Sequence, residues 1–266
     1  MSRLSHASIA PETLILTNRP GTNTVLILGR NSLAMILQAK SEILIEDPAT
    51  QGLHIVLRTL IDLNGYVFVD GVTYMIDLDV ISQFHGLKII PVPLNGDGVD
   101  LKQLEDFLKS NHFKLKNKEF WSLYYTTSTF HNLTGILFSD NVCQILIKLA
   151  RKYDFLITCD NVYNVLHYQD EKPPIRLFVY DHSNDKDCKE HIISNASFAK
   201  IIGPGIRLGW IEAPYRMKAV LDNSGIANSS CFELNLAQKH IRCVHEIYKE
   251  FMLAANLPKD CKMLQP

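Results

Sequence analysis

Near its C-terminal third the chain reads Asn195-Ala-Ser-Phe-Ala-Lys200-Ile-Ile-Gly-Pro-Gly-Ile-Arg207-Leu-Gly-Trp210. Lys200 follows a segment expected to form a buried strand, and Arg207 comes after a Gly-Pro-Gly turn. A lysine at the edge of an apolar core loses its proton readily, and the neutral amine condenses with a carbonyl. An arginine binds phosphate through two parallel hydrogen bonds. A ligand with both groups, such as pyridoxal phosphate, would suit this pair, but a strand, a turn and two solvated cations explain the stretch equally well.

The composition is that of a globular protein with a buried core. Of the 266 residues, 47% are hydrophobic and 21% are charged. The formal net charge of -1 gives no global electrostatic basis for binding nucleic acid or an anionic membrane. No apolar run approaches the roughly 20 residues of a membrane span, and the N-terminus lacks the apolar core of a signal peptide.

The cysteines and histidines give no sign of a disulfide framework or a metal site. The six cysteines are scattered and form no CxxC pair, which favours reduced thiols in a cytosolic protein. His85, His131 and His167 lack the spacing of metal ligands, so they are expected to be structural or surface groups.

Strand-like and helix-like segments alternate along the chain. Strands are expected at 43–45, 66–70, 88–94, 120–125, 155–159, 191–196 and 208–212, and helices at 30–40, 50–63, 74–85, 101–108, 139–153, 215–222 and 232–253. This alternation predicts an α/β fold with a mostly parallel sheet and helices on both faces.

Polar and aromatic residues follow several of these strands. Ligands of an open α/β sheet bind at the carboxyl ends of the strands. The residues found there are Asn132 after 120–125, Asp160 and Tyr163 after 155–159, Ser197 and Lys200 after 191–196, and Tyr74 after 66–70. A further helix begins near Thr50, and a helix N-terminus attracts phosphate.

Each of these residue types suits a pyridoxal phosphate site. Asp160 would keep the pyridine nitrogen protonated, which makes the ring an electron sink. Asn132 and Tyr163 would donate to the phenolate oxygen, and Tyr74 would stack on the ring. Lys200 would form the imine and, once displaced by an amino acid, would move the proton from its Cα.

Ordinary structural roles explain each residue singly. Asp160 could cap a helix, Asn132 could begin an Asx-turn, and Tyr74 and Tyr163 could lie at the rim of the core. The site hypothesis rests on all of these groups falling at strand ends of one sheet.

With these residues in view, the chain resembles the class I/II aminotransferases among the fold-type-I pyridoxal phosphate enzymes. It is most similar to the branch of 2-aminoadipate and kynurenine transaminases, over about residues 30–225. The matching motifs are Val72-Thr-Tyr74 for P-T-Y, Phe130-His-Asn132-Leu-Thr-Gly135 for F-H-N-P-T-G, Asp160-Asn-Val-Tyr163 for D-D-x-Y, Ser197-Phe-Ala-Lys200 for S-F-S-K, and Pro204-Gly-Ile-Arg207-Leu-Gly-Trp210 for P-G-x-R-x-G-W.

The resemblance implies a role for each matched position. It makes Lys200 the Schiff-base lysine, Asp160 the partner of the pyridinium, and Asn132 and Tyr163 the phenolate donors. It makes Ser197 and Arg207 phosphate ligands, Tyr74 the stacking aromatic, and the turn at 48–51, with Thr50, part of the phosphate site.

The chain also departs from the family pattern. Pro48-Ala49 stands where the phosphate turn begins Gly-Ser, which removes a hydroxyl and a backbone donor. Leu133 replaces the proline after Asn132, so Asn132 is expected to be held less rigidly. The family's small domain supplies an arginine for the substrate carboxylate. Neither Arg216 nor Arg242 lies in a matching motif, and the chain resembles a family member truncated at both ends.

Three functions are compatible with this pattern. The first is an aminotransferase that transfers an amino group from an amino acid to a 2-oxo acid through a Lys200 Schiff base. The second is a truncated homologue that binds the cofactor without turnover, as a binding or dimerising protein. The third is the aminotransferase-like effector domain of a transcription regulator, which is disfavoured because no basic winged-helix segment precedes the fold.

The resemblance also implies an organisation for the chain. An N-terminal arm is expected at 1–29, the cofactor-binding large domain at 30–214, and an interdomain helix with the start of a small domain at 215–266. A cytoplasmic homodimer is expected, with no nucleic-acid or membrane partner and no metal.

Overall fold

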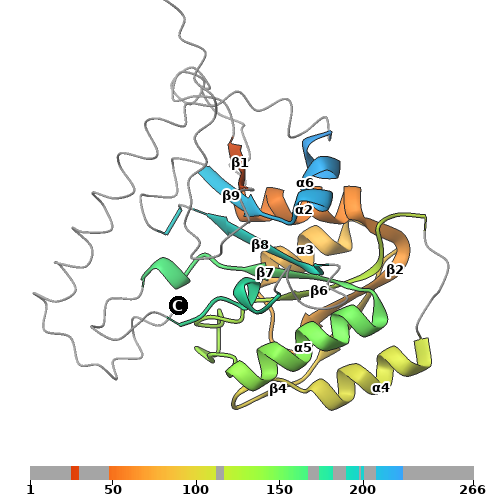
Figure 1. Cartoon of the computed structure of the whole chain (residues 1–266), viewed down its shortest axis with the longest axis vertical. Coiled ribbons are helices and arrows are strands. Elements are labelled where there is room, and N and C mark those ends of the chain that lie inside the picture. Colours follow the sequence, from red (N-terminus) through yellow and green to blue (C-terminus); the bar gives the residue numbers. More distant parts are fainter. Residues whose placement is uncertain are drawn as a thin grey trace, which may run out of the picture.

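In the computed structural model the described residues are 25–29, 48–111, 117–166, 174–181, 190–197, 199–200 and 208–223. Within them a seven-stranded sheet has the order β1-β9-β8-β7-β6-β2-β3 (Figure 1). The strands are β1 (Val25–Gly29), β2 (Ile61–Asp70), β3 (Lys88–Val92), β6 (Phe120–Thr126), β7 (Leu156–Asp160), β8 (Ile192–Ser197) and β9 (Leu208–Glu212). A two-stranded hairpin joins β4 (Leu94–Asn95) to β5 (Gly98–Val99).

The sheet is mostly parallel. The pairs β3–β2, β2–β6, β6–β7 and β7–β8 are all parallel, whereas β9 runs antiparallel to both of its neighbours, β8 and β1. The helices are α2 (Pro48–Leu60), α3 (Met75–Ser82), α4 (Leu101–Asn111), α5 (Asp140–Tyr153) and α6 (Tyr215–Asp222), with 3-10 turns η1 (Asn164–Leu166) and η2 (Leu177–Tyr180).

Helices cover both faces of the sheet and form a buried core on each. One core joins α4, α5 and η2 to strand residues such as Phe68, Tyr124 and Ile157. The other joins α2, α3 and α6 to the residues beside them, such as Val67, Leu123 and Leu156. Successive strand side chains point to opposite faces, so one apolar strand serves both cores. Figure 1 shows α4 and α5 on one side of the sheet and α2 and α6 on the other.

The α/β architecture predicted from the alternation is confirmed, with shifts at element ends. Strand 208–212 and helix 215–222 agree with the prediction. Ser139 is the N-cap of α5, because its side chain accepts a hydrogen bond from the Val142 N–H at 3.3 Å. The helix ends at Asp154, whose φ of 53° places it in the left-handed region.

Two predicted boundaries were wrong. The helix expected over 50–63 begins at Pro48 and ends at Leu60, and Ile61 already pairs with Phe120 in the sheet. The pairing register of β2 with β6 shifts between Ile61 and Tyr66, as at a β-bulge. The helical spacing of apolar residues continues up to Ile61, which is why the sequence predicted too long a helix. The strand expected over 88–94 ends at Val92, and Leu94 belongs to the hairpin instead.

The edge strand β1 was not predicted, because no strand was expected within the N-terminal arm. It pairs with β9 from Val25 opposite Glu212 to Gly29 opposite Leu208. The expected helices at 30–40 and 232–253 and the expected strand at 43–45 lie outside the described residues.

Asp62 fastens the bulged part of β2 to the segment before β6. Its carboxylate accepts hydrogen bonds from the backbone N–H groups of Asn64 at 3.1 Å and Asn117 at 2.8 Å. The bond from Asn117 is the larger of these effects, and together they lower the pKa of Asp62 below its ordinary value of 3.8.

We predict that Asp62→Asn lowers the free energy of unfolding by about 1 kcal/mol at pH 7, because an amide cannot accept both hydrogen bonds. The folded-state pKa is depressed, so this stabilisation is complete above the ordinary pKa and is lost as the pH falls through the folded value. Urea unfolding from pH 7 to pH 2.5 would therefore show the difference shrinking in acid. Asp79→Asn, at an exposed position of α3, is the control. A difference that stays constant down to pH 2.5 would contradict the assignment.

Candidate active site

The carboxyl ends of β6, β7 and β8 lie at one edge of the sheet. In register, Thr126 pairs with Cys159 and Asp160 pairs with Asn195. Leu156 and Ile193 belong to the core on the α2 side. By alternation Asp160, Asn195 and Ser197 point to that same face.

Lys200 comes directly after this edge. It is exposed and lies in a turn three residues beyond Ser197, the last residue of β8. Ser197 is fully buried, and its hydroxyl oxygen accepts a hydrogen bond from the Ala199 N–H at 3.0 Å. This bond holds the backbone that leads from the strand to Lys200.

The first turn of α2 packs against the loop after β7. Ala49, Val162 and Tyr163 form a small buried cluster, and Phe130 of the loop after β6 packs against it. Three segments that are distant in sequence, 48–51, 160–163 and 130–135, therefore meet here. Tyr163 is buried, whereas Thr50, Asn132 and Asp160 are each partly exposed.

Asn195 fixes the position of the α2 N-terminus. Its side-chain N–H donates to the carbonyl oxygen of Ala49 at 2.7 Å, and its backbone carbonyl accepts from the Asn161 N–H at 2.8 Å. The fit needs a glycine at position 52, because a Cβ there would lie 2.2 Å from the Asn195 Oδ1. Asn195 thus links α2, β8 and the loop after β7.

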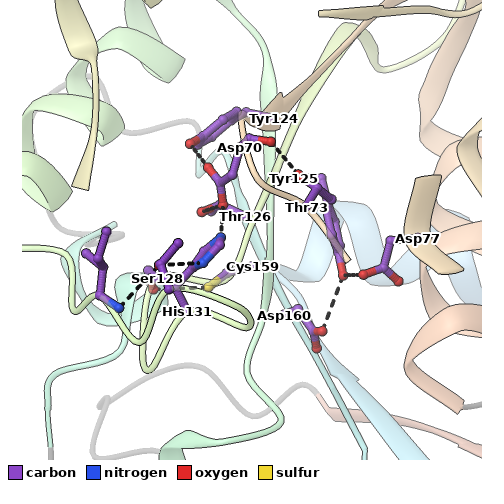
Figure 2. Close-up of polar contacts among 12 residues, drawn as sticks. Asp70, Thr73, Asp77, Tyr124, Tyr125, Thr126, Ser128, His131, Cys159 and Asp160 are labelled. Carbon is purple, nitrogen blue, oxygen red and sulfur yellow. Dashed lines mark hydrogen bonds and ion pairs between the residues drawn. The ribbon is translucent and has the colours of Figure 1, made fainter. Parts of the chain in front are cut away.

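The Asp160 carboxylate faces the hydroxyl of Tyr125. That hydroxyl lies 3.3 Å from the Asp160 Oδ2 and 2.7 Å from the Oδ2 of Asp77 in α3 (Figure 2). Tyr125 is buried, and burial followed by the charges of Asp160 and Asp77 raises the pKa of its hydroxyl well above the ordinary value. The phenol is therefore a permanent donor at neutral pH.

On the opposite face of the sheet, a buried network anchors the loop after β6. The Asp70 carboxylate accepts hydrogen bonds from Tyr124 and Thr126, and it lies 3.2 Å from the His131 Nε2 (Figure 2). The other ring nitrogen of His131 contacts the Thr134 hydroxyl at 2.8 Å. His131 is thus the structural group that its sequence predicted.

The loop itself contains strained backbone. Phe130 and Leu133 have positive φ values of 51° and 97°, which are uncommon for residues with a Cβ. Hydrogen bonds close the loop from Gly135 N–H to the His131 carbonyl at 2.8 Å and from His131 N–H to the Ile136 carbonyl at 2.9 Å. A proline cannot adopt the φ of Leu133, so this loop conformation excludes the proline that the family resemblance places at this position. Asn132 lies between these two strained residues, in a loop that hydrogen bonds of His131 close.

Of the predicted site residues, Tyr163 packs against Ala49, the neighbour of Thr50, and Asp160 pairs in register with Asn195 of β8, the strand that ends at Ser197. Tyr74 lies at the N-cap of α3, partly exposed, in an extended conformation with φ -61°. Arg207 lies outside the described residues. The alternative of a helix cap at Asp160 is not realised, because a bend and then η1 follow it.

Four residues that contribute to this edge were missed in the sequence: Gly52, Asp77, Tyr125 and Asn195. Tyr125 and Asn195 lie in predicted strands, but only the register between the strands decides that they share a face with Asp160. Nothing local in the sequence indicates that Asp77 of α3 meets Tyr125, since the contact joins residues 48 positions apart.

Two observations concern other kinds of site. Among the described residues, no group of three or more His, Cys, Asp or Glu side chains is arranged to hold a metal ion. No helix in the described ranges is long and apolar enough to span a bilayer.

Comparison with known proteins places the chain in a family. The profile "Aminotransferase class I and II" matches residues 26–238. The chain is 28% identical to Aromatic-amino-acid aminotransferase 1 of Thermococcus litoralis over 66% of its own length and 39% of that protein. It is also 28% identical to the uncharacterized HTH-type transcriptional regulator YdfD of Bacillus subtilis, over 66% of the chain and 33% of the regulator.

The fold has counterparts among solved structures. An archaeal alanine:glyoxylate aminotransferase superposes with a TM-score of 0.58 and 25% identity, over 81% of this chain and 44% of that one. The chain spans between 39% and 56% of the length of the first two curated aminotransferases it matches. The profile match covers most of the sequence, and the chain belongs to the class I and II aminotransferase family.

Proposed function

We propose that the protein is a pyridoxal phosphate-dependent aminotransferase that moves an amino group from an amino acid to a 2-oxo acid. The observation that carries the proposal is a set of contacts at one sheet edge: Asp160 at the end of β7 pairs with Asn195 of β8, the strand that leads to Lys200, and Asn195 holds the N-terminus of α2. Membership of the aminotransferase family supports it.

The residues at this edge fit the cofactor chemically. A partly exposed carboxylate, Asp160, suits a protonated pyridine nitrogen. The N-terminus of α2, with the Thr50 hydroxyl beside it, suits a phosphate. An exposed amine at Lys200 suits an aldehyde, to which it would bind as a Schiff base.

The other predicted residues complete the proposed binding site. Asn132 and Tyr163 would donate to the phenolate oxygen, and Tyr74 would stack on the ring. Ser197 and Arg207 would hold the phosphate with Thr50. When bound, pyridoxal phosphate supplies an electron sink that stabilises negative charge at the Cα of an amino acid.

The protein groups would then divide the work. Asp160 would keep a proton on the pyridine nitrogen, because an ionised carboxylate accepts a stronger hydrogen bond than a neutral group does. Lys200, once displaced by the substrate amine, would be the general base that takes the proton from the substrate Cα. The apolar cluster around Tyr163 excludes water from one side.

A second candidate is a ligand-binding domain that keeps the cofactor site without turnover. The similarity to YdfD favours it, because that relative is named as a transcriptional regulator. The altered turn Pro48-Ala49 also favours it, since this turn offers one hydroxyl fewer to a phosphate. The two candidates differ in whether an amino acid changes the bound cofactor.

We predict that the protein with pyridoxal phosphate shows the absorption band of an imine and that Lys200→Ala abolishes this band. The imine requires a covalent bond between the cofactor aldehyde and the lysine amine. Absorption spectra of both proteins with equal cofactor test this. Lys218→Ala, a lysine of α6, is the control. A panel of amino acids would then bleach the band in an aminotransferase and leave it unchanged in a binding domain. The cofactor assignment is wrong if wild type and Lys200→Ala give the same spectrum.

We predict that Gly52→Ala weakens pyridoxal phosphate binding by roughly tenfold. The added Cβ displaces the Asn195 side chain, which holds the α2 N-terminus where the phosphate would bind. Alanine is the better helix former by about 1 kcal/mol, so stability should change less than affinity. Fluorescence titration measures the affinity. Gly96→Ala, where a Cβ meets nothing within 4 Å, should bind as wild type does.

A homodimer is also proposed, as the family resemblance implies. Val72, Met75 and Ile76 are apolar and exposed around the start of α3. Exposed apolar groups of this kind mark association surfaces. Met75→Lys should shift sedimentation velocity toward the monomer, whereas Ile175→Lys, at another exposed apolar position, should not. If both variants associate equally, α3 does not form part of the interface. The cytoplasmic location stays a prediction from the sequence.

A further inference from the structure

The hydroxyl of Tyr125 lies between two carboxylates. It is 2.7 Å from the Asp77 Oδ2 and 3.3 Å from the Asp160 Oδ2 (Figure 2). Asp77 and Tyr125 are 5% and 3% exposed, and Asp160 is partly exposed at the edge of the site. The three groups come from α3, β6 and β7, so the contact exists only in the folded chain.

One phenol proton cannot satisfy two carboxylates equally. The shorter distance shows that the proton is directed mainly at Asp77, which leaves the Asp160 oxygen facing a phenol that is already engaged. The first turn of α3 favours negative charge at Asp77, because the helix N-terminus carries a partial positive charge. Asp160 therefore has a nearby negative charge and only a weak share of the donor.

We propose that Asp77 and Tyr125 form a positioning pair that orients the Asp160 carboxylate and sets the pH range in which it stays ionised. This inference rests on the proposed function, in which Asp160 must be ionised to hold the pyridine nitrogen proton. Neither Asp77 nor Tyr125 was a site residue in the sequence, and neither would touch the reacting atoms.

Other groups lie in the segments beside Asp160. Cys159 precedes it on β7 but points to the other face, where burial raises the pKa of its thiol to about 11. From β8 the register partner of Asp160 is Asn195, which is uncharged. Tyr163 follows in the loop, and Lys200 follows β8. Asp77 is thus the carboxylate that reaches Asp160 through a shared donor.

The pair predicts opposite effects for two variants. Tyr125→Phe removes the shared donor, so Asp160 takes up a proton at higher pH. The acid limb, which is the low-pH part of the curve of cofactor binding against pH, then moves up by about one pH unit. Asp77→Asn removes the competing charge and frees the phenol for Asp160, so the acid limb moves down. On the acid limb Tyr125→Phe should therefore bind roughly tenfold more weakly than wild type, and Asp77→Asn more tightly.

The experiment is a titration of each variant with pyridoxal phosphate from pH 5 to pH 8.5, followed by fluorescence. Tyr124→Phe is a matched control, because it removes a neighbouring buried hydroxyl that donates to Asp70 on the other face. Asp70 keeps Thr126 as a donor. Opposite shifts of the acid limb support the positioning pair. Shifts in the same direction, or weaker binding without a shift, would overturn it and leave only a packing role.

A readout without cofactor separates this inference from the proposed function. In Tyr125→Phe the carboxylates of Asp77 and Asp160 lose the hydroxyl that they share. We expect the pKa of the carboxylate pair in the folded state to rise above its value in the unfolded chain. The loss of stability relative to wild type should then grow as the pH rises from 5 to 8. In Tyr124→Phe it should grow less. If wild-type protein binds no pyridoxal phosphate, the proposed function fails, and a flat pH dependence for Tyr125→Phe would overturn the coupling of the carboxylates independently.

Discussion

The in-register parallel pairing of β6, β7 and β8 is the constraint on which the candidate site depends. Because side chains alternate along a strand, this register places Tyr125, Asp160 and Asn195 on the face covered by α2 and α3. A slip of one residue would turn Asp160 toward α5 and bury its charge among apolar side chains. Two apolar faces oppose such a slip, since each strand contributes residues to both cores.

Two adjacent tyrosines each donate a hydrogen bond to a buried carboxylate, one on each face of the sheet. Tyr124 donates to Asp70 on the α5 side, and Tyr125 donates to Asp77 on the α3 side. Burying a carboxylate without a donor is costly, so each acid requires such a hydroxyl. The two networks lead to different parts of the site: one contacts His131, which precedes Asn132 in the loop after β6, and the other reaches Asp160. Both hold polar residues of the candidate site from below.

At each departure from the family pattern, the structure shows local contacts that fit the residue present. Leu133 adopts a φ that proline cannot, and the hydrogen bonds around His131 close the loop at that point. At the α2 N-terminus, where Pro48-Ala49 offers one hydroxyl fewer, Asn195 holds the Ala49 carbonyl and Gly52 leaves the space for it. The strain at Leu133, of order 1–3 kcal/mol, lies beside a proposed cofactor ligand, where such conformations are often found.

The sequence by itself determined the α/β class, most strands and helices, the family, and the candidate residues at the strand ends. These follow from local signals: apolar periodicity, the Ser139 cap, and motifs such as Ser197 to Lys200. Only the tertiary structure decided the extent of β2, the pairing of β1, and the contacts of Asp77 and Asn195. Each of these depends on residues far apart in the chain, as between Asn195 and Ala49, and no local propensity encodes a partner 146 positions away.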